Sequence, residues 1–449
     1  MTNDNNSGLK TVGRHGGRPR RRGWLALMPL VLLAVMMALM GVLMGDFSKV
    51  PMCVVFLVVS IASLFTLRGY PIEERVSCFS HGAGDKNLLL MVWIFVLAGA
   101  FAKSAQAMGA VSATVDLTMA LLPENLLLAG LFLSSCIVSI CVGTSVGTIV
   151  ALVPVAAEMS ARTGSGTALM VAAIVGGAFF GDNLSFISDT TVAATRTQGC
   201  SMRDKFRTNF RIVLPAAVLC FVLYVAIGFN SSSAGVGVDI ASVHLWRVLP
   251  YVVVLVTAVM GMNVLLSLCL GVVLTGVVGI ADGALSTAEW VSSLSEGIIG
   301  MGELILISMM AGGLLAVVRK AGGVTYIVRS ITRRVHSRRG AELCISGLVS
   351  FTNLCTANNT VAILSVGSIA SDISKRFKVD PRRSASLLDI FSCVVQGVIP
   401  YGAQLLMASG LAAISPMDII PYLYYPLLLA VAALLSIAFA KGRGEAPTR

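Results

Sequence analysis

The chain has 449 residues, of which 56% are hydrophobic and only 12% are charged. Soluble globular proteins carry about 25% charged residues, so this composition excludes an ordinary water-soluble domain. Apolar runs of about 20 residues recur along the chain, and a helix of that length spans the hydrocarbon core of a bilayer. The sequence therefore predicts an all-α polytopic membrane protein.

The net charge of +11 does not indicate nucleic-acid binding, because the Lys and Arg residues cluster between apolar runs, as topology signals do. The ten cysteines and four histidines lack the spacing of a zinc site. The sequence also contains no nucleotide-binding fingerprint. We therefore expect no nucleic-acid partner, no metal centre, no cofactor and no enzymatic activity.

The first apolar run, Trp24 to Met44, follows a basic tail at residues 1–23 that we expect in the cytoplasm. No small-residue cleavage site follows this run, so we expect an uncleaved helix. The predicted spans lie near 24–44, 50–67, 88–102, 167–195, 208–229, 248–262, 264–281, 298–318, 384–415 and 420–440. Their even number returns the C-terminal tail, residues 441–449, to the cytoplasm. The expected location is a bacterial inner membrane.

The two halves of the chain resemble each other weakly. A shift of 213 residues places Ala98-Gly99 on Ala311-Gly312, and a shift of 214 places residues 156–162 on residues 370–376. This similarity predicts an internal duplication, with one repeat at 24–229, an outer linker at 230–247 and a second repeat at 248–440. Each repeat has five predicted spans, and an odd number implies that the repeats are inverted.

Charge also predicts inversion. The segment Leu343 to Ser371 has seven basic residues shortly before it and five shortly after it, whereas the matching segment Asn125 to Ala157 has only Lys103 and Arg162. Equivalent loops are therefore expected on opposite sides of the membrane. Because both flanks of each segment carry the same bias, we predict two re-entrant hairpins whose tips face the protein interior.

Four polar interruptions occur at matching places in the two repeats. They are the hairpin tips, residues 143–148 and 356–360, and the middles of two long spans, residues 181–191 and 396–404. Gly and Pro unwind helices, and the freed carbonyls can join side-chain oxygens around a hard cation. Each interruption alone also fits a packing face, a helix-linking hydrogen bond, a kink or a surface loop. Their matching positions favour one site near the middle of the membrane, formed by two broken helices and two tips.

Asp389 is a further carboxylate in an apolar setting. Two interpretations remain open from the sequence. It is either a second proton-binding group or the ion-pair partner of Arg382 or Arg383, one or two helical turns away.

The run from Phe180 to Thr191 resembles the FGD-x-LSP-x-SDTT motif of NhaC-type sodium/proton antiporters, and residues 143–148 resemble their GTS-x-GT motif. One departure is Phe186, where many relatives have Pro. Asn358-Asn359-Thr360 is similar to the Ser-Asn-Thr hairpin tips of the wider ion-transporter superfamily. The resemblance implies a scaffold and a moving transport domain.

Motifs and resemblance together give a set of candidate ion- and proton-binding residues. They are Asp182, Asn183, Ser185, Asp189, Thr190, Thr144, Ser145, Thr148, Asn358, Asn359, Thr360, Asp389, Gln396 and Gln404. We hypothesise that sodium, or lithium, and protons compete for Asp182 and Asp189 first. Burial favours the protonated carboxyl, whereas a bound cation favours the ionised one, so exchange by alternating access follows.

Two other functions are considered. An exchanger of a small organic acid or amino acid would hold a carboxylate at the helix N-termini, with help from Arg196. A channel or a non-transporting receptor would not need inverted repeats. Membrane lipid and a second copy of the chain, in a homodimer, are the expected macromolecular surroundings.

Overall fold

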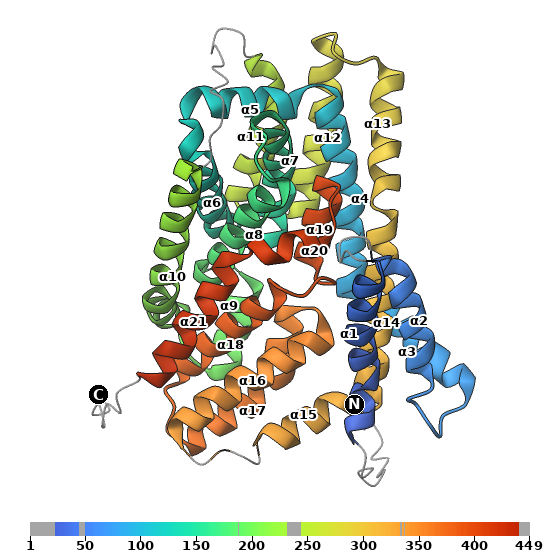
Figure 1. Ribbon diagram of the computed structural model, residues 1–449, viewed down its shortest axis with the longest axis vertical. Coiled ribbons are helices and arrows are strands. Elements are labelled where there is room, and N and C mark those ends of the chain that lie inside the picture. Colours follow the sequence, from blue (N-terminus) through green and yellow to red (C-terminus); the bar gives the residue numbers. More distant parts are fainter. Residues whose placement is uncertain are drawn as a thin grey trace, which may run out of the picture.

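The computed structural model describes residues 23–44, 50–186, 188–230, 244–332, 335 and 337–439. Its regular elements are helices (Figure 1). Within the described residues, eight helices are long and apolar enough to cross a membrane, or nine if one bent pair counts as a span. This confirms the all-α polytopic membrane protein. Residues 1–22 and 440–449, and most of the predicted linker, lie outside the described residues.

The helices of the first half are α1 (Met28–Leu43), α2 (Met52–Leu64), α3 (Ile72–Ala83), α4 (Lys86–Ala107), α5 (Ala110–Leu121), α6 (Glu124–Val142), α7 (Ser145–Thr163), α8 (Thr167–Leu184), α9 (Asp189–Gln198) and α10 (Met202–Asn230). A short 3-10 helix, η1 (Gly23–Leu27), precedes α1.

The helices of the second half are α11 (Leu245–Val259), α12 (Val264–Ala281), α13 (Thr287–Gly300), α14 (Gly302–Lys320), α15 (Gly323–Thr332), α16 (Arg338–Thr356), α17 (Asn359–Arg376), α18 (Pro381–Gln396), α19 (Ala403–Ala412), α20 (Pro416–Ile419) and α21 (Tyr424–Ala438), with the 3-10 helix η4 (Ile420–Tyr422) before α21.

Three helices have no counterpart in the predicted spans, namely α3, α5 and α15. They are short, between 10 and 12 residues, so a search for apolar runs of membrane length does not find them. The predicted span near 298–318 is also too short, because α13 and α14 together form one apolar stretch from Thr287 to Lys320.

Both hairpins turn through the same local geometry. Gly143 and Ala357 end α6 and α16 in the left-handed conformation, and the next residues, Thr144 and Asn358, are extended before α7 and α17 begin. The two turns are 214 residues apart. Gly adopts a positive φ without strain, whereas Ala at the second tip does so at a cost of about 1 kcal/mol.

The hairpins occupy opposite halves of the molecule. Figure 1 shows α6 and α7 in its upper half, and α16 and α17 in its lower half. By length and composition, the arms Asn125–Val142 and Ser145–Thr163 could each cross a membrane. The re-entrant path of the hairpins therefore stays a prediction.

The long helices outside the hairpins cross at paired glycines. Gly99 of α4 meets Gly297 of α13, and Gly82 of α3 meets Gly312 of α14, so closely that a Cβ on any of them would collide with its neighbour. The two contacts exchange under the shift between the repeats, since residues 82 and 99 correspond to 297 and 312. Swapped contacts of this kind support the predicted inverted repeat.

Candidate functional site

The candidate site is built around the break between α8 and α9. α8 ends at Leu184, and Ser185 and Ser188 both have extended backbone before α9 begins at Asp189. The break forms although Phe186 stands in place of the proline of many relatives. Phe186 is exposed and stacks on Phe206 of α10, with ring centroids 4.7 Å apart.

Asp182 lies in the last turn of α8 and is only 4% exposed. One carboxylate oxygen accepts a hydrogen bond of 2.7 Å from the Ser145 hydroxyl, at the start of α7. The other accepts a bond of 3.0 Å from the Ser188 hydroxyl, across the helix break. Thr190 lies 3.0 Å from Ser188 and extends this group of hydroxyls. An acidic group with only neutral hydroxyl partners can take up either a proton or a small cation.

A chain of hydrogen bonds connects Asp182 to the second half of the protein. The amide of Gln404, on α19, donates to the Ser145 hydroxyl at 3.1 Å. Gln396 donates to the side-chain oxygen of Gln404 at 2.9 Å and to the carbonyl of Ala357, in the second hairpin tip, at 3.0 Å. The sequence therefore correctly placed Asp182, Ser145, Gln396 and Gln404 together.

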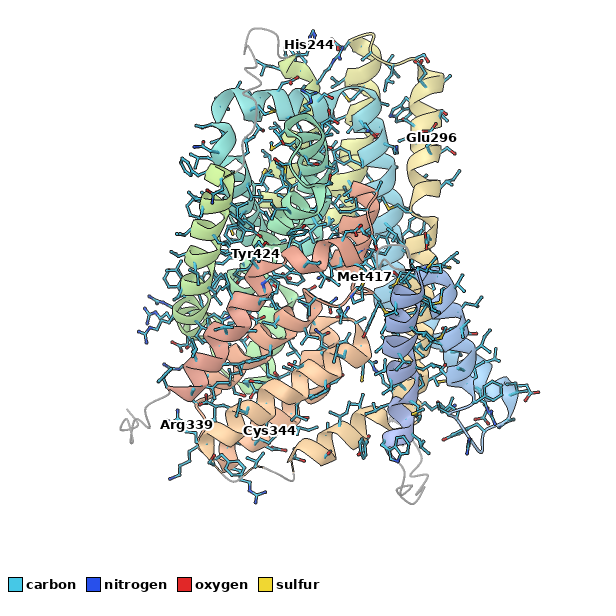
Figure 2. All side chains as sticks on the ribbon, in the orientation of Figure 1. His244, Glu296, Arg339, Cys344, Met417 and Tyr424 are labelled. Carbon is cyan, nitrogen blue, oxygen red and sulfur yellow. The ribbon has the colours of Figure 1, made fainter. Side chains whose placement is uncertain are left out.

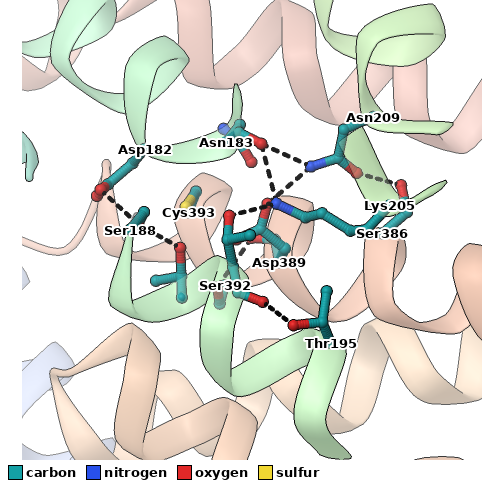
Figure 3. Close-up of polar contacts among 12 residues, drawn as sticks. Asp182, Asn183, Ser188, Thr195, Lys205, Asn209, Ser386, Asp389, Ser392 and Cys393 are labelled. Carbon is teal, nitrogen blue, oxygen red and sulfur yellow. Dashed lines mark hydrogen bonds and ion pairs between the residues drawn. The ribbon is translucent and has the colours of Figure 1, made fainter. Parts of the chain in front are cut away.

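Asp389 belongs to a neighbouring network in the same region (Figure 3). Its partner is Lys205 of α10, whose ammonium lies 2.7 Å from the carboxylate, and both side chains are almost fully buried. The predicted pairing with Arg382 or Arg383 is wrong, because Arg382 lies near Asp204 and Asp380 while Arg383 pairs with Glu342. Asn209 also donates to Asp389, at 2.8 Å.

Asn183 belongs to both regions. Its backbone carbonyl accepts from Lys205 at 3.0 Å and from Asn209 at 2.8 Å. Its side-chain amide donates to the carbonyl of Phe179, and its side-chain oxygen is buried without a hydrogen-bond partner. Unpaired buried oxygens occur also on Gln396 and Asp389. Such atoms are free to receive a cation or a hydrogen-bond donor.

Other candidates lie further from Asp182 in this conformation. Asp189 is exposed in the first turn of α9. Asn358 caps α17 through a bond from the amide of Val361, and Asn359 contacts the thiol of Cys393. The remaining candidates lie on the tips and at the break: Thr144 precedes α7, Thr148 is buried within it, Thr360 follows Asn359, and Ser185 is buried after α8.

Sequence reasoning missed Ser188, Lys205 and Asn209. Lys205 was interpreted as one of several basic residues of an inner loop, but it lies in the first turns of α10 and points inward. Its spacing of four residues from Asn209 puts both on one helical face. The buried residues Ile212 and Val213 continue this face, and that pattern was the available signal.

A cavity of about 640 Å³ lies between α3, α14 and the second hairpin tip. Its lining includes Glu74, Asp85, Arg319 and Lys320, and on the tip side Ala357 and Ala403. Gln396 bonds to the carbonyl of Ala357, and Gln404 follows Ala403 in the chain. The two glutamines therefore connect the wall of the cavity to Ser145 and Asp182.

Comparison with known proteins identifies the family. The model of the Na+/H+ antiporter family matches residues 22–229 and 237–441. The malate-2H(+)/Na(+)-lactate antiporter of Bacillus subtilis is 23% identical over 81% of this chain and 84% of its own length. The Na(+)/H(+) antiporter NhaC of Alkalihalophilus pseudofirmus is 22% identical over 91% of this chain and 94% of its own length.

Among solved structures, the YdaH transporter of Alcanivorax borkumensis covers 92% of this chain and 97% of its own, at 12% identity and a TM-score of 0.41. The family model matches nearly the whole sequence, in two segments. The chain belongs to the Na+/H+ antiporter family.

Proposed function

We propose that this protein exchanges sodium for protons across a bacterial inner membrane, with both chain ends in the cytoplasm and Asp182 as the group for which the two ions compete. A sodium ion would bind the ionised carboxylate, with hydroxyl and amide oxygens around it. A proton would neutralise the same carboxylate when sodium leaves. Asp189, exposed at the start of α9, would meet the ion on its way in or out.

The observation that carries the proposal is the environment of Asp182. The carboxylate is buried in a broken helix, and its hydrogen-bond partners are the hydroxyls of Ser145 and Ser188. A buried carboxylate without a cationic partner is costly, so it needs an exchangeable positive charge. Asp389 is different, because Lys205 already neutralises it.

Alternating access would use the two repeats. The contacts of α7 with α19, and of α17 with α9, correspond under the shift between the repeats and lie beside the two breaks. In an inverted repeat, the halves can exchange their conformations and so open the site to either side. The cavity beside the second tip would be the water-filled path on one side, with Gln396 and Gln404 between it and Asp182. Lipid would surround the exposed apolar helices, and a homodimer stays a prediction.

The test is sodium-dependent proton movement in vesicles that contain the purified protein. A preset pH gradient should collapse when sodium is added to the wild type. Asp182→Asn keeps the shape of the side chain but removes its charge, and it should abolish the response. Asp189→Asn should weaken the response and keep part of it.

Glu296→Gln is the matched control, since Glu296 is an exposed carboxylate on the outer side of α13 (Figure 2). It should exchange at the wild-type rate. Full activity of Asp182→Asn in correctly folded protein would contradict the proposal.

One observation favours a second candidate, the exchange of a small organic acid. The cavity is larger than a sodium ion requires, and two cationic side chains, Arg319 and Lys320, line it. The Bacillus subtilis relative is named for malate and lactate. Malate or lactate would then collapse the preset gradient only together with sodium. A gradient that responds to sodium alone favours the simple ion exchanger.

A further inference from the structure

The break between α8 and α9 creates a problem at membrane depth. The last four carbonyls of a helix have no partner within it, and the interior of the membrane offers no water to satisfy them. Asn183 is in the last turn of α8, directly after Asp182. Its carbonyl therefore needs donors from elsewhere in the protein.

Lys205 supplies one of these donors and reaches across the break. Its ammonium lies 3.0 Å from the Asn183 carbonyl on α8 and 2.7 Å from the Thr191 hydroxyl on α9. The third contact is Asp389 on α18, at 2.7 Å. An ammonium has three hydrogens to donate, and here three acceptors on three helices receive them. A positive charge at the C-terminal end of α8 is also favourable to the helix dipole.

The surroundings make this arrangement rigid. Lys205 is 1% exposed and Asp389 is fully buried. Asn209, one turn along α10, donates to both the Asn183 carbonyl and Asp389, and Ser386 of α18 donates to the oxygen of Asn209. α10 packs against α8, α9 and α18, so the anchor and the segments it holds belong to one packed unit.

We propose that Lys205 is a positioning residue for the ion site: it holds the two ends of the broken helix at a fixed separation, and it thereby sets the position of Asp182 relative to Ser145 and Ser188. Asp389 is the counter-ion that keeps the ammonium in place. The inference rests on the proposed exchange at Asp182. It assigns Lys205 a task other than neutralising Asp389, and the two tasks can be separated by experiment.

The experiment measures the half-saturating sodium concentration for proton movement in vesicles, with wild type, Lys205→Met and the double variant Lys205→Met with Asp389→Asn. If Lys205 positions the site, sodium half-saturation rises by about tenfold or more in the single variant, as expected for loss of charged hydrogen bonds. It stays raised in the double variant, because the bonds to Asn183 and Thr191 are still missing. Lys375→Met, at an exposed lysine of α17, is the control and keeps the wild-type value.

A double variant that returns to the wild-type value would overturn the inference, since Lys205 would then serve only as the counter-ion of Asp389. An unchanged single variant would do the same. Thr191→Val keeps the ion pair and removes one contact, so it tests the proposal even if Lys205→Met does not fold. It should raise sodium half-saturation by about threefold, and no change would also overturn the inference. Absence of exchange in the wild type would instead reject the proposed function.

Discussion

The amide of Gln404 donates a hydrogen bond of 3.1 Å to the hydroxyl of Ser145, and through this bond the second repeat reaches the carboxylate of Asp182. Ser145 begins the inner arm of the first hairpin, and Gln404 is in the first turn of the helix after the second break. The contact therefore joins one polar interruption from each repeat. The position that matches Asp182 in the second repeat, 214 residues later, is Gln396. The mirrored site thus carries an amide where the first carries a charge.

Ser145→Ala should weaken sodium binding. The Ser145 hydroxyl donates to the ionised form of Asp182, the form that sodium requires. Loss of a hydrogen bond to a charged group costs about 1.5–3 kcal/mol, so we expect half-saturating sodium to rise by about ten- to hundredfold. The hydroxyl of Ser365 bonds only within its own helix, α17, so Ser365→Ala should behave as wild type. Equal sodium affinity of both variants would show that the Ser145 bond does not act on the ion site.

Sodium half-saturation should depend on pH in one direction. Protons and sodium compete for the same carboxylate, and cation binding must release the proton. As the pH falls, the protonated fraction of the site grows, and sodium half-saturation should rise by up to about tenfold per pH unit. The measurement is exchange at graded sodium concentrations from about pH 6 to about pH 9. A half-saturation that is constant with pH would mean that the two ions bind at separate sites.

Gly297→Ala should destabilise the protein in detergent. An added Cβ would collide with the backbone of Gly99, which forces α4 and α13 apart, and overpacking of this kind costs about 1–3 kcal/mol. Gly300→Ala is a matched control on the same helix, because nothing lies within 4 Å of the added Cβ. A thermal melt of the purified proteins compares them. We expect a lower melting temperature for Gly297→Ala alone, and similar values for both would contradict the close contact.

Glu342→Gln should destabilise the second hairpin. The carboxylate is 1% exposed and lies 3.1 Å from Arg383 of α18 and 3.7 Å from Arg338. Removing one member of a buried ion pair leaves the other charge uncompensated, at a cost of about 3–5 kcal/mol. Glu289→Gln offers a contrast, since Glu289 is an exposed capping residue at the start of α13, where loss of the cap costs about 1 kcal/mol. Protease resistance near α16 and α17 reports the difference, and equal resistance would argue against the pair.

The composition and the local pattern of the sequence are sufficient for the fold class and for the places where the chain departs from regular helix. Apolar runs of membrane length lead to the polytopic fold, and polar, Gly-containing interruptions mark both tips and both breaks. These features are local, since they depend on which residues are neighbours in the chain. For the same reason the candidate residues Asp182, Ser145, Gln396 and Gln404 could be named from the sequence.

Tertiary structure decided which charges are buried and which residues they meet. Lys205 is one basic residue among several near the start of α10, and a basic residue that orients the chain has the same sequence appearance as one that anchors a broken helix. Only the packing of α10 against α8, α9 and α18 brings its ammonium to Asp389 and Asn183. Packing likewise buries Asp182 and leaves Asp189 exposed, although seven residues separate them. Distances between residues far apart in the chain are set by how helices pack, and helix patterns alone do not encode them.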